Sequence, residues 1–395
     1  SSAASDVYKR QNYVCTNIHL MENNNPFITN GYISAEYFCD RVTETETLTR
    51  YITNGNNVAL ISPRRLGKTG LIEHCFHQKH IGDKYYTFLI DVYATKNLQE
   101  FVFELGKGIL NGLKPRGRKA WDLFLSCLSS LRAGISFDFA GNPGWNLEMG
   151  DIKTPSITLD EIFYYLEKAD RPCLVSIDEF QAIAKYPEKN VEAMLRTHIQ
   201  HCTNARFIYA GSQRHMMGEI FTSPARPFYQ STAIMELHPI DMRTYTKFIR
   251  EHFIVANKDI TEETIQNVYE RFEGITWYIQ FISNSLYAMT NIDEICTTDK
   301  VNIAIENILS QLNFTYSSLL YQLPPKQKEV LFAICKEGKA KEITSSRFLK
   351  TYKLTASSVQ GAIKGLLDKD FVTCELGEYK AYDKFFEIWL LKQSQ

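Results

Sequence analysis

The segment from Ser62 to Thr69 reads SPRRLGKT and constrains the fold of this chain more than any other segment. A Gly-Lys-Thr sequence between an apolar run and an amphipathic segment is typical of a phosphate-binding loop, in which backbone N–H groups and a helix N-terminus surround an anion. The apolar run Val58 to Ile61 predicts a buried parallel strand before the loop, and Thr69 to Gln78 predicts a helix after it. The context therefore fits a strand, a phosphate loop and a helix.

The loop departs from the usual G-x-x-x-x-G-K-[ST] pattern at its first position, where Ser62 replaces glycine. Serine is small, but it tolerates a positive φ less well than glycine. An accidental Gly-Lys-Thr in a basic turn is the alternative interpretation. In a true phosphate loop, Lys68 reaches the β- and γ-phosphates and the Thr69 hydroxyl binds Mg²⁺. The residues expected to hold the nucleotide are Ser62, Pro63, Arg64, Arg65, Leu66, Gly67, Lys68, Thr69 and Gly70.

A second motif strengthens the first. The largely apolar run Cys173 to Ile177 predicts a buried strand, and Asp178 and Glu179 follow it directly. We expect Asp178 to hold the metal through water, and Glu179 to act as the base that polarises the attacking water. A single acid after a core strand often caps a helix instead, but a pair of acids following a phosphate loop favours a Mg²⁺-dependent nucleoside triphosphatase.

Two further residues are candidates for completing the catalytic site. Ser212 ends a predicted strand that begins at Arg206. This strand should lie between the strand before the phosphate loop and the strand before the acid pair, so the Ser212 hydroxyl can reach the γ-phosphate or the attacking water. A serine that caps the next helix is an equal alternative. Arg226 is best placed by chain order for an arginine finger, which stabilises charge on the γ-phosphoryl group, although an ordinary surface arginine is the alternative. The other cationic candidates are Arg64, Arg65 and Arg214.

Strands alternate with helices through the first two thirds of the chain. Tyr86 to Val92 predicts another strand, and Leu98 to Leu113 and Ile157 to Glu167 predict helices, so we expect an α/β fold with a doubly wound parallel sheet. Residues 114–155 are less regular in pattern and contain a predicted hairpin insert at about 132–150. The expected parts are an N-terminal loop and helix (21–57), a P-loop core (58–238), an all-helical lid (239–321) and a winged-helix domain (322–395).

Residues 1–11 match the translation of a common transposase sequencing adapter. We therefore expect residues 1–20 to be an artefactual leader and Met21 to be the natural start. The net charge is −1, and the nine cysteines include no C-x-x-C pair, which favours reduced thiols in the cytoplasm over disulfides or a zinc site. No long apolar run predicts a membrane span.

The C-terminal segment predicts helices at Lys326–Lys336, Ser345–Tyr352 and Ser357–Lys369, then a strand pair about Gly377. Three helices and a β-wing form a winged helix. The third helix offers Ser357, Ser358, Gln360 and Lys364 to DNA bases but also carries Asp368, so an intramolecular packing module is an equal interpretation.

Together these residues resemble the archaeal-type ATPase family of the AAA+/STAND group of P-loop NTPases. The pattern Phe38-x-x-Arg41-x-x-Glu44, the double-arginine loop, the strand ending at Glu179 and Ala210-Gly211-Ser212 carry the resemblance, which covers most of the chain from Asn25. It implies ATP rather than GTP, with Mg²⁺, and a helical lid in which Thr276 replaces the proline of the family's G-x-P motif. No sensor-2 arginine is identified.

The leading hypothesis is an ATP-dependent molecular switch whose lid and winged helix respond to the nucleotide. One alternative is an ATP-regulated DNA-binding protein of the initiator type. Another is an adaptor whose insert near Trp145 recruits a protein partner, and self-association is also open.

Overall fold

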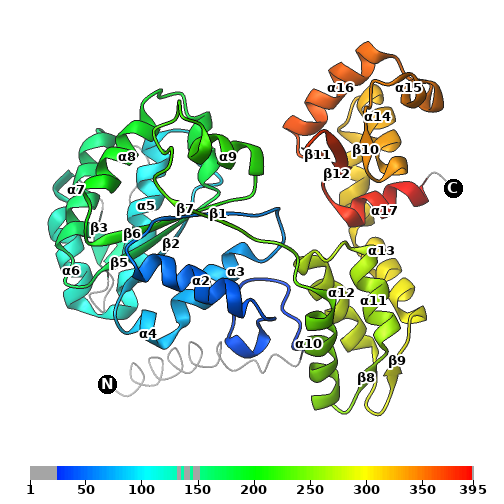
Figure 1. Ribbon diagram of the computed structural model, residues 1–395, viewed down its shortest axis with the longest axis horizontal. Coiled ribbons are helices and arrows are strands. Elements are labelled where there is room, and N and C mark those ends of the chain that lie inside the picture. The colour runs from blue at the N-terminus through cyan, green and yellow to red at the C-terminus, as the bar shows by residue number, and fades with distance from the viewer. Residues whose placement is uncertain (1–24, 131–134, 138–142, 146–151, 394–395) are drawn as a thin grey trace, which may run out of the picture.

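The computed structural model describes residues 25–130, 135–137, 143–145 and 152–393. Figure 1 shows three parts: a sheet with helices on both faces, a helical unit beside it, and a smaller C-terminal unit above the helical one. The sheet is five-stranded and wholly parallel, in the order β2-β5-β6-β1-β7. Its strands are β1 (Val58–Ile61), β2 (Tyr86–Asp91), β5 (Cys173–Asp178), β6 (Ala205–Gly211) and β7 (Ala233–Glu236).

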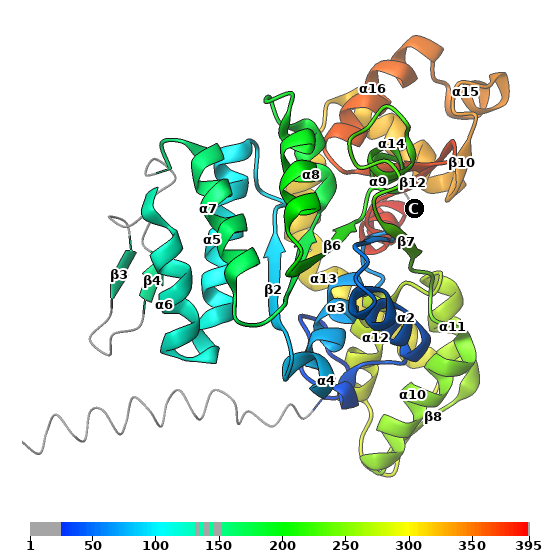
Figure 2. The same ribbon diagram turned by 60° about the vertical axis from the view of Figure 1, so that its left-hand side comes forward.

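Helices cover both faces of this sheet because alternate residues of each strand point to opposite sides. Val58 and Leu60 of β1 join a core with helices α2 and α3, whereas Ala59 and Ile61 join the core on the other face. Figure 2 shows the helices of that other face, among them α5 and α7, beside β2. The doubly wound α/β fold is confirmed. The helices are α2 (Val42–Thr53), α3 (Lys68–His77), α4 (Lys79–Gly82), α5 (Leu98–Leu113), α7 (Pro155–Lys168), α8 (Val191–His201) and α9 (Arg214–Thr222).

Residues 114–155 are more regular than their sequence pattern predicts. A short 3-10 turn, η2 (Lys114–Arg116), leads into helix α6 (Arg118–Cys127), which buries Trp121 and Phe124. The sequence did not predict this helix, because Pro115 and Gly117 interrupt the apolar pattern just before the helix starts. The hairpin insert contains the antiparallel strands β3 (Ile135–Phe137) and β4 (Pro143–Trp145), and the rest of 132–150 lies outside the described residues.

The lid is helical apart from one short parallel strand pair that the sequence did not predict. Its helices are α10 (Met242–Val255), α11 (Glu262–Arg271), α12 (Thr276–Met289) and α13 (Asp299–Tyr321), and the pair is β8 (Asp259–Ile260) with β9 (Ile295–Cys296). Among the described residues, no helix combines the length and apolar character that crossing a membrane requires.

The C-terminal unit has the predicted three helices followed by a wing. Thr355 caps the third helix in a capping box with Ser358. A short strand before the second helix adds a third strand to the wing, and a final helix follows it. The elements are α14 (Pro325–Glu337), β10 (Ala340–Lys341), α15 (Ser346–Tyr352), α16 (Ala356–Asp368), β11 (Val372–Glu375), β12 (Glu378–Ala381) and α17 (Lys384–Lys392).

One hydrophobic core runs through the lid and the winged helix, and the N-terminal segment joins it. The Phe27 ring is fully buried, with its centroid 5.8 Å from the rings of Phe253 and Tyr287. The Asn284 side chain of α12 donates to the Phe27 carbonyl at 2.8 Å. The segment before α2, which includes the 3-10 turn η1 (Ala35–Tyr37), is therefore fastened to the lid and forms one wall of the site described next.

Candidate nucleotide-binding site

The phosphate loop connects β1 to α3 and takes its two left-handed residues from its second half. Arg65 has φ 68° and Gly67 has φ 88°. Ser62 is not among the residues with positive φ, and its N–H continues the β1–β6 ladder by donating to the Gly211 carbonyl at 3.2 Å. The missing first glycine therefore introduces no backbone strain, because that position keeps a conformation any residue adopts.

Four predicted side chains meet where this loop faces the end of β5. Lys68 Nζ lies 2.8 Å from Asp178 Oδ1 and 3.1 Å from Glu179 Oε1. The Thr69 hydroxyl donates to Asp178 Oδ2 at 2.6 Å. Parallel strands present their carboxyl ends at one sheet edge, which brings the acid pair against the loop. The sequence motifs thus form a single cluster.

This cluster suits Mg²⁺. The described residues contain no group of three His, Cys, Asp or Glu side chains able to hold a metal by themselves. Mg²⁺ instead prefers one or two protein oxygens, with water and phosphate completing its shell. Thr69 and Asp178 supply such oxygen atoms, their side chains lie in contact, and they are the residues that would hold the ion.

Glu179 is held by two further side chains. Its φ is 56°, and its Oε2 accepts from Ser212 Oγ at 2.7 Å and from Gln181 Nε2 at 2.5 Å. The strand order confirms that β6 lies between β5 and β1, as the role of Ser212 requires. Gln181, in the turn η5 (Phe180–Lys185), was missed in the sequence, where its only signal is a polar residue just after the acid pair.

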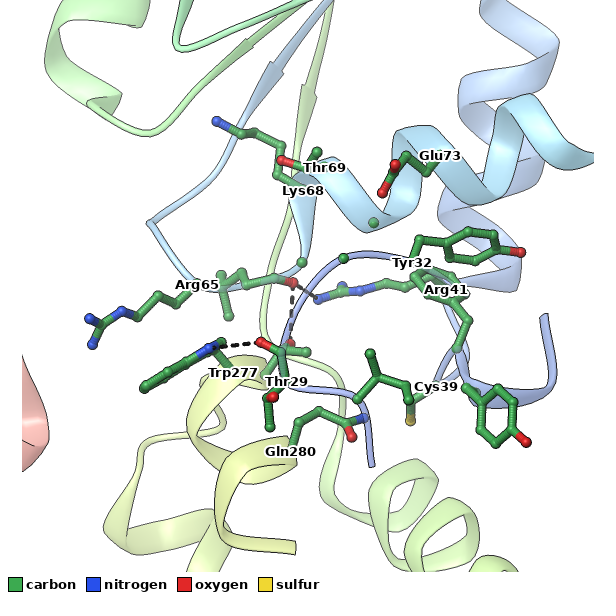
Figure 3. Close-up of a pocket in the computed structure, with 18 of the residues that line it drawn as sticks. Thr29, Tyr32, Cys39, Arg41, Arg65, Lys68, Thr69, Glu73, Trp277 and Gln280 are labelled. Atoms are coloured by element: carbon green, nitrogen blue, oxygen red, sulfur yellow. Dashed lines mark hydrogen bonds between the residues drawn. The ribbon is translucent and has the colours of Figure 1, made fainter. Parts of the chain in front are cut away.

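The loop opens into a pocket of about 360 Å³, shown in Figure 3. This volume is within the range of small-molecule sites. The N-terminal segment and helix α12 form the wall opposite Lys68 and Thr69, and Cys39 and Gln280 belong to that wall. Burial raises the pKa of the Cys39 thiol well above its usual range, so this wall presents a neutral thiol.

Arg41 explains the Phe38-x-x-Arg41-x-x-Glu44 pattern. Its side chain is buried, and it donates to Glu44 Oε1 at 2.6 Å, to the His238 carbonyl at 2.6 Å and to the Leu66 carbonyl at 3.2 Å. One guanidinium therefore joins α2, the end of the sheet and the phosphate loop.

The lid contacts the loop backbone directly. Thr276 Oγ1 donates to the Leu66 carbonyl at 3.2 Å, and the backbone N–H of Trp277 donates to the Arg65 carbonyl at 3.0 Å. A proline at 276 has no hydroxyl and could not make the first of these bonds. Thr276 thus supplies a contact of its own where the family motif has proline.

The two loop arginines point to the winged helix. Arg65 Nη2 lies 3.1 Å from Asp383 Oδ2, and its guanidinium lies over the Trp277 ring at 4.5 Å. Arg64 Nη1 lies 3.4 Å from Asp370 Oδ2. Winged-helix side chains thus reach the nucleotide site, which the sequence did not predict.

The remaining arginine candidates do not line this pocket. Arg226 pairs with Glu192 at 3.1 Å and with Glu219 at 3.8 Å, and Arg214 pairs with Glu236 at 2.9 Å. Burial raises the pKa of Glu192, and the Arg226 charge opposes that rise. Within this one chain, the structure does not bring Arg226 to the catalytic cluster.

Comparison with known proteins agrees with this geometry. The Walker-type ATPase of Pyrococcus abyssi superposes with a TM-score of 0.63 at 18% identity, covering 93% of this chain and 99% of that one. The chain has a P-loop ATPase fold. The ORC2 protein of Aeropyrum pernix, in its ADPNP–ADP complexes, gives a TM-score of 0.54 at 14% identity, covering 94% of this chain and 98% of that one.

The P-loop ATPase fold is accompanied by a recognised C-terminal module. Residues 314–392 match a family model described as a probable winged helix domain. No curated protein matches the sequence. The structural neighbours and the winged helix agree with the resemblance to archaeal-type ATPases.

Proposed function

We propose that this protein binds ATP and hydrolyses it slowly with Mg²⁺, and that it acts as a nucleotide-controlled molecular switch. The observation that carries the proposal is the cluster of Lys68, Thr69, Asp178 and Glu179, of which Lys68, Thr69 and Glu179 line the pocket. It provides a cation for the β- and γ-phosphates, a hydroxyl that would bind the metal, a carboxylate that would hold the metal through water, and a second carboxylate that can take a proton from water. Ser212 supports the same role, since it reaches both Glu179 and the pocket.

The switch part of the proposal is supported by the contacts around the loop. Thr276 and Trp277 bind the loop backbone, and Asp383 binds Arg65. A triphosphate that occupies the loop changes the charge beside these contacts, so its presence biases the position of the lid and the winged helix. A ligand shifts an equilibrium between two conformations only through contacts that differ between them. The contacts of Thr276, Trp277 and Asp383 with the loop are candidates for contacts that differ between the nucleotide-bound and the nucleotide-free conformation.

Adenine as the base is supported by Gln280. This side chain is buried, lines the pocket wall opposite the phosphate loop, and its Oε1 has no hydrogen-bond partner (Figure 3). A glutamine amide presents an acceptor and a donor side by side, which matches the N6 and N7 groups of adenine, whereas guanine presents two acceptors at that edge. The ORC2 neighbour, solved with adenine nucleotides, agrees with this choice.

Replacing Gln280 by leucine should therefore weaken ATP binding by about tenfold and reduce the preference for ATP over GTP, because one amide–base pair contributes about 1–3 kcal/mol. Equilibrium titration with both nucleotides measures this. Gln266→Leu, at an exposed site on α11, is the matched control. Unchanged discrimination in Gln280→Leu would remove Gln280 from the base site.

The proposed function is tested by measuring ATPase turnover of the full chain with and without duplex DNA. A parallel experiment measures the mass of the protein in solution with a non-hydrolysed ATP analogue. We expect turnover without DNA. Absence of turnover under both conditions contradicts the hydrolytic function. A nucleotide-dependent rise in mass would support Arg226 as a finger supplied to a neighbouring copy.

DNA binding is a second candidate function, because α16 leaves Ser357, Gln360 and Lys364 exposed. If α16 reads DNA, duplex retained on a filter should fall steeply as salt rises, since each neutralised phosphate releases counterions. Lys364→Ala should then reduce the slope by about one. Binding too weak to show a salt slope would reject this candidate.

A further inference from the structure

A chain of polar side chains leads from the winged helix to Glu179. Asp370, in the turn between α16 and β11, lies 3.4 Å from Arg64 Nη1. Arg64 Nε donates to Ser212 Oγ at 3.2 Å, and Ser212 Oγ donates to Glu179 Oε2 at 2.7 Å. The four residues belong to the winged helix, the phosphate loop, the end of β6 and the end of β5.

The chemistry of these groups fixes the direction of each hydrogen bond. A guanidinium has only donors, so the Ser212 oxygen accepts from Arg64. The single hydroxyl proton of Ser212 is then directed at Glu179. Gln181 donates to the same Glu179 oxygen at 2.5 Å, and Lys68 lies 3.1 Å from the other one. Both oxygens of Glu179 are therefore engaged by protein donors.

The winged helix contacts Arg64 at two points. Besides Asp370, the Tyr382 ring lies beneath the guanidinium, with the centroid 5.1 Å from Cζ. The Arg64 side chain is largely covered, at 22% exposure, whereas Asp370 is half exposed at 45%. When the winged helix is docked, it sets the position of Arg64 and offsets its charge, which a γ-phosphate would otherwise attract.

We propose that Arg64 is a positioning residue through which the docked winged helix restrains the catalytic base. Docking maintains the hydrogen bond from Arg64 to Ser212 and the hydrogen bond from Ser212 to Glu179, and these bonds hold the base in a resting arrangement. Loss of the Asp370 contact frees Arg64, weakens the Ser212–Glu179 bond and makes the Glu179 carboxylate available to water. This inference rests on the proposed function, because it needs Glu179 to act as the base.

The test is steady-state ATP hydrolysis by the full chain carrying Asp370→Asn. Asp370 has φ 55°, a conformation that asparagine tolerates well, so the backbone should be undisturbed. We expect kcat to rise about two- to fivefold with KM unchanged, the ratio that one partly exposed ion pair provides. Asp368→Asn, an exposed site two residues away, is the matched control and should behave as wild type.

A double-mutant cycle with Ser212→Ala separates this chain from a general loosening of the winged helix. If the effect passes through Ser212, Asp370→Asn should not raise kcat further once Ser212 is replaced. An equal rise in both backgrounds, or an unchanged or lower kcat in Asp370→Asn beside an active wild type, overturns the inference. A wild-type chain that binds ATP without any turnover overturns the proposed hydrolysis, and this inference with it.

Discussion

Replacing Lys68 by alanine should weaken ATP binding by at least about a hundredfold, as measured by equilibrium titration with Mg²⁺. Each charge-assisted hydrogen bond to a phosphate contributes about 1.5–3 kcal/mol, and Lys68 is positioned to make two. The loss also removes the cation that lies between Asp178 and Glu179. Two carboxylates without a counter-charge then face an incoming triphosphate and repel it.

The control for this variant is Lys84→Ala, since Lys84 is exposed and lies before β2, outside the pocket. Its ATP affinity should equal that of the wild type. Thermal unfolding of both variants checks that the fold is retained. Wild-type affinity in a folded Lys68→Ala protein would mean that the loop does not hold the phosphates.

Glu179→Gln should retain ATP binding and lose turnover by about 10²–10⁴-fold, the contribution of a positioned general base. Glutamine has the same size as glutamate, and its single amide oxygen can keep the bonds from Ser212 and Gln181. It gives up the ion pair with Lys68, and it cannot take a proton from water. The measurement is kcat beside the dissociation constant for ATP. The variant should trap bound ATP under conditions in which the wild type releases ADP.

Glu46→Gln provides the matched control, because Glu46 is an exposed residue on α2. Both its kcat and its ATP affinity should be those of the wild type. A kcat in Glu179→Gln within a few-fold of the wild-type value would exclude Glu179 as the base, and another group near the cluster would then have to accept the proton from water.

Much of the site could be predicted because its signals are local. A strand, a loop and a helix in sequence place Lys68 and Thr69, and a buried strand that ends in two acids places Asp178 and Glu179. The rule that parallel strands end at one edge then brings the two motifs together without any knowledge of the packing. The three helices and the wing of the C-terminal unit were predictable for the same reason.

What the sequence missed depends on long-range packing. The edge strand β7 is only four residues long and buries Met235 alone, so its short apolar run from Ala233 to Met235 gives a weak local signal. Gln181 and Gln280 become notable only when the fold turns one toward Glu179 and the other into the pocket. Likewise, the contacts of Arg64 and Arg65 with Asp370 and Asp383 join positions that are 306 and 318 residues apart.

The most direct test of the central claim is a single-turnover experiment with radiolabelled ATP and the purified full chain. The site geometry predicts that phosphate is released when Mg²⁺ is present, and that chelation of the metal stops the release because Thr69 and Asp178 then have no ion to hold against the phosphates. Phosphate release at an equal rate with the metal chelated, or no release with Mg²⁺ present, would contradict the assignment of this cluster as a Mg²⁺-dependent ATPase site.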